Sequence, residues 1–127
     1  MDAATRTGIS GVRTVAVPVS DQDRAVGFYV ERLGFEVRMD APLPELGGRW
    51  IEVAAPGSAT TLALIPARED APAGADTGIR LSAGDPAALH RDLQEHSVDA
   101  GELLVWDGVP PMFTLRDPDG NQLVVVG

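Results

Sequence analysis

The second half of this chain repeats the plan of its first half. Thr14–Asp21 reads TVAVPVSD, and 64 residues later Gly78–Asp85 reads GIRLSAGD. Apolar residues alternate in both stretches, which is typical of a half-buried strand, and each stretch ends in an Asp that can cap a helix. About a dozen residues with helical spacing follow each Asp, and short strand-like runs come next. The repeat therefore predicts an α+β fold of two strand–helix–strands modules, whose remaining sheet faces are free to enclose a ligand.

The 127 residues are enough for one domain with its own core. We expect a frayed or disordered terminus over residues 1–10 and a single domain over 11–127, made of modules 11–66 and 77–127. The first helix begins at Ser20, where Asp23 completes a pattern like a capping box, or at Asp21, and it ends near Gly34. The second begins at Asp85-Pro86. Strands are predicted over 12–19, 35–40, 49–54, 60–65, 77–83, 102–106, 112–116 and 122–126, with a loop over 41–48.

Composition narrows the class of partner. The net charge is −9 and there is no cysteine, so nucleic acid and anionic membrane surfaces are disfavoured, and disulfides and thiolate metal sites are excluded. The acidity is compatible with a cationic ligand, but solubility alone is the simpler explanation. No apolar run is long enough to span a membrane, and the polar start does not resemble a signal peptide. We expect a cytoplasmic protein.

Two motifs resemble a known family. Val19-Ser20-Asp21, followed by Arg24-Ala25, Phe28-Tyr29 and Leu33-Gly34-Phe35, is similar to the first module of the vicinal oxygen chelate superfamily, which holds glyoxalase I, extradiol dioxygenases and bleomycin-resistance proteins. Asp117–Asn121 (DPDGN) is similar to that superfamily's closing hairpin. The resemblance extends from about Val12 to Val126. It implies two tandem βαβββ modules that form a cupped mixed β-sheet, with a helix on the outer face of each module.

The resemblance also implies where a metal would bind and how the chain would assemble. Metal-dependent members place ligands on the first and last strand of each module, which here correspond to Thr14, Ala63, Gly78 and Val124. A divalent metal needs three or four His or carboxylate donors at about 2 Å, and shifting each position by one residue supplies none. We therefore predict no metal and no cofactor. Many small members pair across a two-fold axis with clefts between subunits, so a homodimer is expected.

Strand alternation selects the candidate binding residues. If Ile51 and Val53 face the core, then Trp50 and Glu52 face the concave side of the sheet. With Trp106 added as a cavity rim or a dimer contact, the predicted ligand-binding set is Thr14, Trp50, Glu52, Thr61, Arg80, Trp106, Met112 and Thr114. The alternative is that Trp50 only fills the cup and Glu52 pairs with Arg80.

Catalytic patterns are sparse. Glu52 is the one weak candidate for a general base, because a single carboxylate has no visible partner to tune it. His90 and His96 lie on opposite flanks of the second helix, and we expect the first to be exposed and the second partly packed. The favoured function is a metal-independent small-molecule binder that resembles the drug-sequestering, bleomycin-resistance branch, with a cationic or aromatic ligand. The alternative is a glyoxalase-like lyase, isomerase or dioxygenase acting on a small organic substrate in the same cup. A third class is a regulatory or structural module with no ligand.

Overall fold

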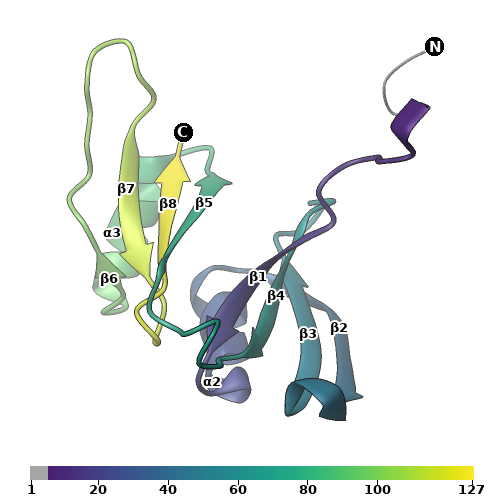
Figure 1. Cartoon of the computed structure of the whole chain (residues 1–127). Helices are drawn as coiled ribbons and strands as arrows, with labels where there is room; N and C mark the ends of the chain where they lie inside the picture. The colour runs from purple at the N-terminus through teal and green to yellow at the C-terminus, as the bar shows by residue number, and fades with distance from the viewer. Residues whose placement is uncertain (1–5) are drawn as a thin grey trace.

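The computed structural model describes residues 6–127, which form two modules side by side (Figure 1). The first contains β1 (Thr14–Val19), α2 (Gln22–Gly27), η1 (Phe28–Arg32), β2 (Glu36–Leu43), η2 (Pro44–Leu46), β3 (Gly48–Ala54) and β4 (Thr61–Pro66). The second contains β5 (Asp76–Ser82), α3 (Pro86–Glu95), β6 (Asp99–Ala100), β7 (Met112–Arg116) and β8 (Gln122–Val126). Half of the terminus expected to fray, residues 1–5, lies outside the described residues, while residues 6–10 are exposed.

Each module has the same sheet topology. The strand orders are β1-β4-β3-β2 and β5-β8-β7-β6, with the first and last strands of each module parallel and the other neighbours antiparallel. The tandem βαβββ fold predicted from the sequence is thereby confirmed. It follows that β1 and β5 lie at sheet edges, each with one side unpaired within the described chain.

The first helix begins at Asp21 rather than at Ser20. The Asp21 carboxylate accepts a hydrogen bond from the backbone N–H of Arg24 at 3.0 Å, as an N-cap does. The helix then widens into the π-helical turn η1 and ends at Gly34, whose φ of +74° favours glycine. The capping-box prediction at Ser20 is therefore wrong, because the Ser20 side chain is used elsewhere, as described below.

Two predicted boundaries are also wrong. The loop expected over 41–48 is shorter than predicted, because β2 continues to Leu43 through Pro42, and only the turn η2 and Gly47 separate it from β3. A proline is tolerated there since β2 is an edge strand and its missing N–H costs no ladder bond. The strand expected over 102–106 is absent, and that stretch makes a single bridge, Leu104 to Met112, next to the two-residue strand β6.

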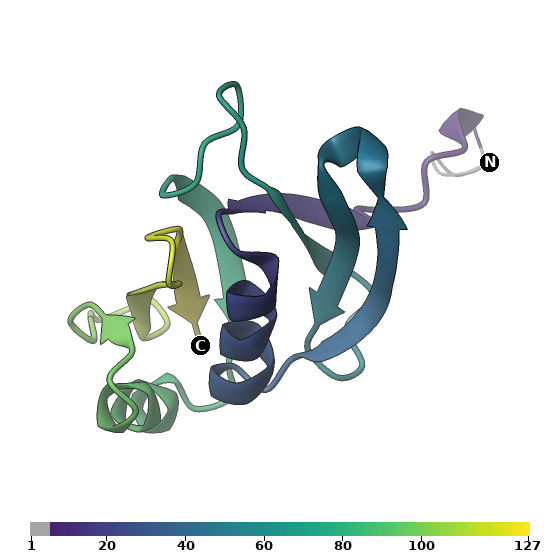
Figure 2. The same cartoon turned by 90° about the horizontal axis from the view of Figure 1, so that it is seen from below.

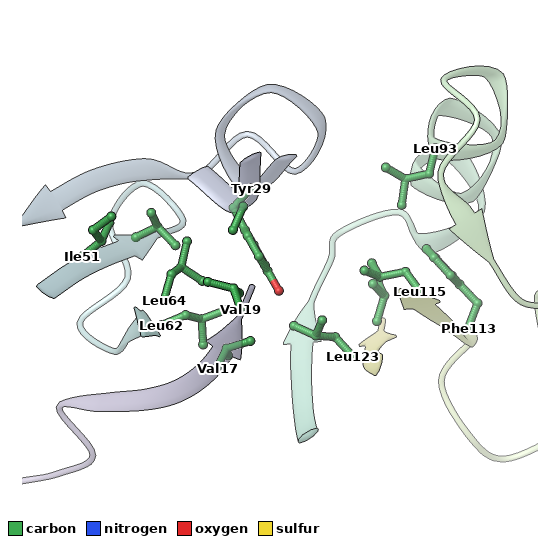
Figure 3. Close-up of a cluster of buried hydrophobic side chains, with 13 residues drawn as sticks. Val17, Val19, Tyr29, Ile51, Leu62, Leu64, Leu93, Phe113, Leu115 and Leu123 are labelled. Atoms are coloured by element: carbon green, nitrogen blue, oxygen red, sulfur yellow. The ribbon is translucent and has the colours of Figure 1, made fainter. Parts of the chain in front are cut away.

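One apolar core spans both modules. Helix α2 lies between the first sheet and the closing hairpin of the second module, as both views show (Figures 1 and 2). In Figure 3 the Tyr29 ring lies between the buried side chains of the first sheet and Leu123 of the second module, and Leu93, Phe113 and Leu115 lie beyond Leu123. The largest of them, fully buried, include Tyr29, Ile51, Leu64, Leu93, Phe113, Leu115 and Leu123. Burying each such side chain stabilises the fold by about 1.5–3 kcal/mol, so the two modules form a single unit.

The turn from Asp117 to Asn121 joins the modules. Tyr29 donates its hydroxyl to Asp117 Oδ2 at 2.9 Å, and the fully buried Asn121 donates to the carbonyl of Pro18 at 2.8 Å. Burial and the adjacent Asp117 carboxylate raise the pKa of Tyr29. The Ser20 backbone N–H and hydroxyl both donate to Asp119 Oδ1. The motif that marks the family in sequence is therefore an inter-module joint in the structure.

Candidate functional site

The concave face of the first sheet carries a continuous chain of polar side chains from three strands. Trp50 and Glu52 are two residues apart on β3, so they share a face, and the indole Nε1–H donates to Glu52 Oε2 at 2.7 Å. The Thr61 hydroxyl, from β4, donates to Glu52 Oε1 at 2.7 Å. The hydroxyls of Thr61 and Thr14 are 2.8 Å apart, and Thr14 lies on β1. Four of the predicted site residues are thus brought together.

The carboxylate at the centre of this chain is buried and ionised. Glu52 is 3% exposed, and besides Trp50 and Thr61 it accepts a longer contact of 3.5 Å from the Arg13 guanidinium. The hydrogen bonds from Trp50 and Thr61 hold the pKa of Glu52 below its usual value, although burial acts in the opposite direction. A carboxylate whose oxygens both accept hydrogen bonds and whose pKa is lowered is a weak proton acceptor. The geometry therefore favours binding or positioning over general-base chemistry at Glu52.

A hollow of about 300 Å³ lies over the second sheet. It contains three further predicted residues, Arg80, Met112 and Thr114, and its wall also includes Glu102. The Arg80 guanidinium donates to the carbonyl of Gly78 at 3.0 Å, and within residues 6–127 no carboxylate lies within 4.0 Å of it. The hollow thus combines apolar walls with an arginine that is free to bind an acceptor.

The two groups of residues do not line one cavity. No residue of the first module lines the 300 Å³ hollow, and the concave face of the first sheet is the face opposite α2. A larger cavity, of about 600 Å³, lies between the modules along β5 and is lined by Val15, Phe35 and Leu62 together with Ile79 and Leu81, among others. The alternative pairing of Glu52 with Arg80 is wrong, because the cation beside Glu52 is Arg13.

Trp106 stands apart from both groups. Its side chain is 59% exposed in the irregular segment before β7, where Val105 and Val109 are also exposed at 69% and 44%. Within one chain it contributes to neither cavity described above. An exposed apolar cluster of this kind is typical of an interaction surface.

The histidines are arranged opposite to expectation. His90 is the packed one: its ring meets Phe113 edge-on at 4.9 Å, and its Nε2 lies 2.8 Å from the Gly101 carbonyl oxygen. His96 is the exposed one, at the end of α3. The spacing placed them correctly on different flanks but did not reveal which flank packs on β7.

Sequence reasoning missed two charged residues. Arg13 precedes β1, where strand alternation no longer restricts a long side chain, and its side chain is 74% exposed. Glu102 lines the second hollow from an irregular stretch that was read as strand. In both cases the sequence shows a charged residue, but it does not show in which direction the side chain points.

The positions where relatives would hold a metal have no suitable donor set. Thr14 hydrogen-bonds within the polar chain, and Ala63, Gly78 and Val124 carry no ligating side chain. Across residues 6–127, no three His, Asp or Glu side chains gather as a metal-binding group would. The residues present therefore do not fit a divalent metal at these positions. No helix in the described part of the chain is both long enough and apolar enough to cross a membrane.

Known proteins resemble this chain over most of its length. TnmS3, an antibiotic binding protein from Streptomyces sp. CB03234, is 34% identical, with a TM-score of 0.85 over 94% of this chain and 97% of its own. A superfamily member from Sphaerobacter thermophilus DSM 20745 is also 34% identical, with a TM-score of 0.84 over 94% of this chain and 98% of that one. The uncharacterized protein YetH of Bacillus subtilis (strain 168) is 42% identical over 59 residues, which span 46% of this chain and 48% of YetH.

The sequence also matches the model of a protein family over nearly the same residues as the two modules. The model of the Glyoxalase/Bleomycin resistance protein/Dioxygenase superfamily matches residues 11–125. Together with the tandem βαβββ topology and the inter-module turn, this match shows that the chain belongs to that superfamily.

Proposed function

We propose that this protein binds a small organic molecule on its concave faces without a metal, and that it acts by sequestering an antibiotic. The single observation that carries the proposal is the first face, where a half-buried Trp50 ring is held by an already satisfied carboxylate. Such a face offers a stacking surface but no free base. The similarity to an antibiotic binding protein over 94% of the chain supports the same function.

The proposed site residues are those predicted from the sequence, and among them the buried Glu52 and Thr61 support Trp50 and do not contact the ligand. Trp50 supplies an aromatic surface, and the net charge of −9 favours a cationic partner that can stack on it. Arg80 supplies a donor for an acceptor group on the same molecule. The full set remains Thr14, Trp50, Glu52, Thr61, Arg80, Trp106, Met112 and Thr114. A cytoplasmic location is part of this proposal, and cell fractionation would test it.

A homodimer is the second part of the proposal. Support comes from the unpaired edges of β1 and β5 and from the exposed apolar cluster Val105, Trp106 and Val109. Because the two faces of one chain line no common cavity, a second copy could join the first face of one chain to the hollow of the other. Sedimentation equilibrium at tens of micromolar should give twice the 13.3 kDa chain mass. A clean monomer there would contradict this part.

A fluorescence titration tests the binding function. In the Trp106→Phe variant Trp50 is the only tryptophan, since the chain has two. Calorimetric titration of wild type with the same probes shows whether loss of Trp106, itself a proposed site residue, changes the affinity. Bleomycin and daunorubicin serve as cationic probes and 2-naphthoic acid as an anionic one. We expect saturable quenching by a cationic probe with a Kd of roughly micromolar or tighter. Absence of saturable quenching by any probe, in folded protein, would contradict the proposal.

Metal content separates this function from the enzymatic alternative. After dialysis, elemental analysis should find far less than one equivalent of zinc, nickel, manganese or iron per chain, and a chelator should leave the titration unchanged. Stoichiometric metal held by protein side chains would instead favour a lyase or dioxygenase of the same superfamily.

A further inference from the structure

A hydrogen bond within the protein orients the Trp50 ring, although solvent could satisfy the indole N–H at this partly buried position. A half-buried indole on a sheet face can adopt several rotamers, and solvent can satisfy its N–H. Here the indole Nε1–H instead donates to Glu52 Oε2 at 2.7 Å, a short, charge-assisted bond to a residue on the same strand. The bond fixes the ring relative to the face on which a ligand would lie.

The acceptor itself is held from the opposite side. Oε1 of Glu52 accepts from the Thr61 hydroxyl at 2.7 Å, and Thr61 in turn lies 2.8 Å from the Thr14 hydroxyl. Glu52 pairs in register with Ala63 between β3 and β4, and Thr14 pairs with Thr61 between β1 and β4. Three strands thus fix the carboxylate, which leaves it little freedom to follow a moving ring.

Structural need alone does not account for this arrangement. A buried carboxylate is costly to desolvate, and an apolar side chain of similar size often serves a sheet equally well. Within residues 6–127 the one cation that pairs with Glu52 is Arg13, whose side chain is 74% exposed and 3.5 Å away, so its contribution is screened by solvent. What the carboxylate adds, and an apolar residue would not, is a fixed acceptor for the indole.

We propose that Glu52 is a positioning residue whose function is to fix the Trp50 ring plane before a ligand arrives. The inference rests on the proposed function, in which Trp50 contacts the ligand. A ring that is already ordered loses little conformational entropy on binding, which strengthens stacking without any new contact. Glu52 then acts through Trp50 and does not take part as a base.

The ligand-free protein tests the anchoring step. All variants are made in the Trp106→Phe background, so that Trp50 alone reports. The Trp50 indole ¹⁵N–¹H signal should lie downfield and exchange slowly with solvent. Glu52→Gln retains an acceptor and should preserve both properties of the indole signal. Glu52→Leu should abolish both properties, and it should at least double the amplitude of the fast component in the anisotropy decay of Trp50. If Glu52→Leu lowers the melting temperature but leaves the indole signal and anisotropy unchanged, Glu52 is only structural and the proposal is overturned.

A pH titration keeps the test valid even if Glu52→Leu does not fold. In the Trp106→Phe protein, the indole signal should shift as Glu52 becomes protonated, with Arg13 as the charged neighbour in contact. A pH-independent indole signal across the acid range would overturn the anchor.

The last step measures the functional role with daunorubicin as probe. Glu52→Gln should bind within about threefold of the parent, and Glu52→Leu about tenfold more weakly. Equal affinity in all three would overturn the positioning role. A parent protein that binds no probe but shows the anchored indole would count against the proposed function and not against the anchor, because the anchor is measured without ligand.

Discussion

The two sheets share one topology but present different concave faces. On the first, Thr14, Thr61, Glu52 and Trp50 hydrogen-bond in series, and the central carboxylate is 3% exposed. On the second, Arg80 lies beside a hollow of about 300 Å³, and its guanidinium has no carboxylate within 4.0 Å among the described residues. A repeated module has thus produced one ordered face and one open face.

The difference separates two contributions to recognition. An ordered face fixes the direction of an aromatic contact, which favours specificity. An open face with an exposed arginine that has no carboxylate partner among the described residues offers its donors to an acceptor group of the ligand. Substitutions of the polar side chains that hold Trp50 on the first face should therefore affect the stability of the fold as well as binding, whereas those on the second face should affect the affinity for a ligand and little else.

A matched pair of threonine substitutions should show the largest difference in stability. Thr61→Val keeps the side-chain shape but leaves Glu52 Oε1 without its donor, so it should lower the free energy of unfolding by about 1–3 kcal/mol. Thr114→Val, on the open face, should change it by less than about 0.5 kcal/mol. Urea denaturation of both variants measures the contrast. Equal losses in the free energy of unfolding for the two variants would show that the side chains of the first face are held no more firmly than those of the second.

The inter-module turn provides a second stability test, independent of either face. Gly120 has a φ of +82° in the turn from Asp117 to Asn121. A β-branched residue is strained there, so Gly120→Val should cost on the order of 1–3 kcal/mol. The chain would still carry both faces, and thermal unfolding gives the measurement. An unchanged melting temperature would contradict the turn geometry.

Acid should weaken the first face selectively. Because the folded-state pKa of Glu52 is lowered by its bonds to Trp50 and Thr61, its ionised form stabilises the fold above the unfolded-state pKa of about 4.3. That contribution is lost as the pH falls from there through the lower folded-state pKa. Wild type should therefore lose more stability than Glu52→Gln over this acid range, by denaturation at stepped pH. If the stabilities of wild type and Glu52→Gln fall in parallel with pH, the fold does not hold Glu52 in its ionised form.

The smallest effect on stability is expected at Arg80. Arg80→Gln removes the guanidinium from the open hollow but breaks no ion pair, so the free energy of unfolding should change by less than about 0.5 kcal/mol. The affinity for both probes should fall, and it should fall more for the anionic 2-naphthoic acid than for daunorubicin. Loss of stability with no effect on either probe would remove Arg80 from the site.

The sequence was sufficient for the fold where local signals agree with tertiary packing. Asp85 accepts from the backbone N–H of Ala88 and is followed by Pro86, so the second helix begins where predicted. The strand expected at 102–106 failed because alternation alone does not supply a partner. The stretch pairs with β7 at Leu104 and Met112, and the pairing does not continue because Pro111 and Pro110, the next residues in that register, lack backbone donors.

For the site, strand parity placed Trp50 and Glu52 on one face, and their bond within that face was not foreseen. Parity fixes the side of a sheet but not the partner of a long side chain. Arg13 therefore replaced Arg80 as the cation beside Glu52. Bonds that depend on side-chain reach, such as that from Ser20 to Asp119, became visible only once the two modules were seen together.

The central claim is that the first face is a ligand site, and Trp50→Ala tests it most directly. Melting temperature and its shift on adding daunorubicin are measured for the variant beside wild type. We predict that the variant folds with little loss of stability, because the ring is only partly buried, and that the ligand-induced shift disappears. A loss of roughly 3–5 kcal/mol in stability, with the ligand-induced shift retained, would show that Trp50 is a core residue and would contradict the account.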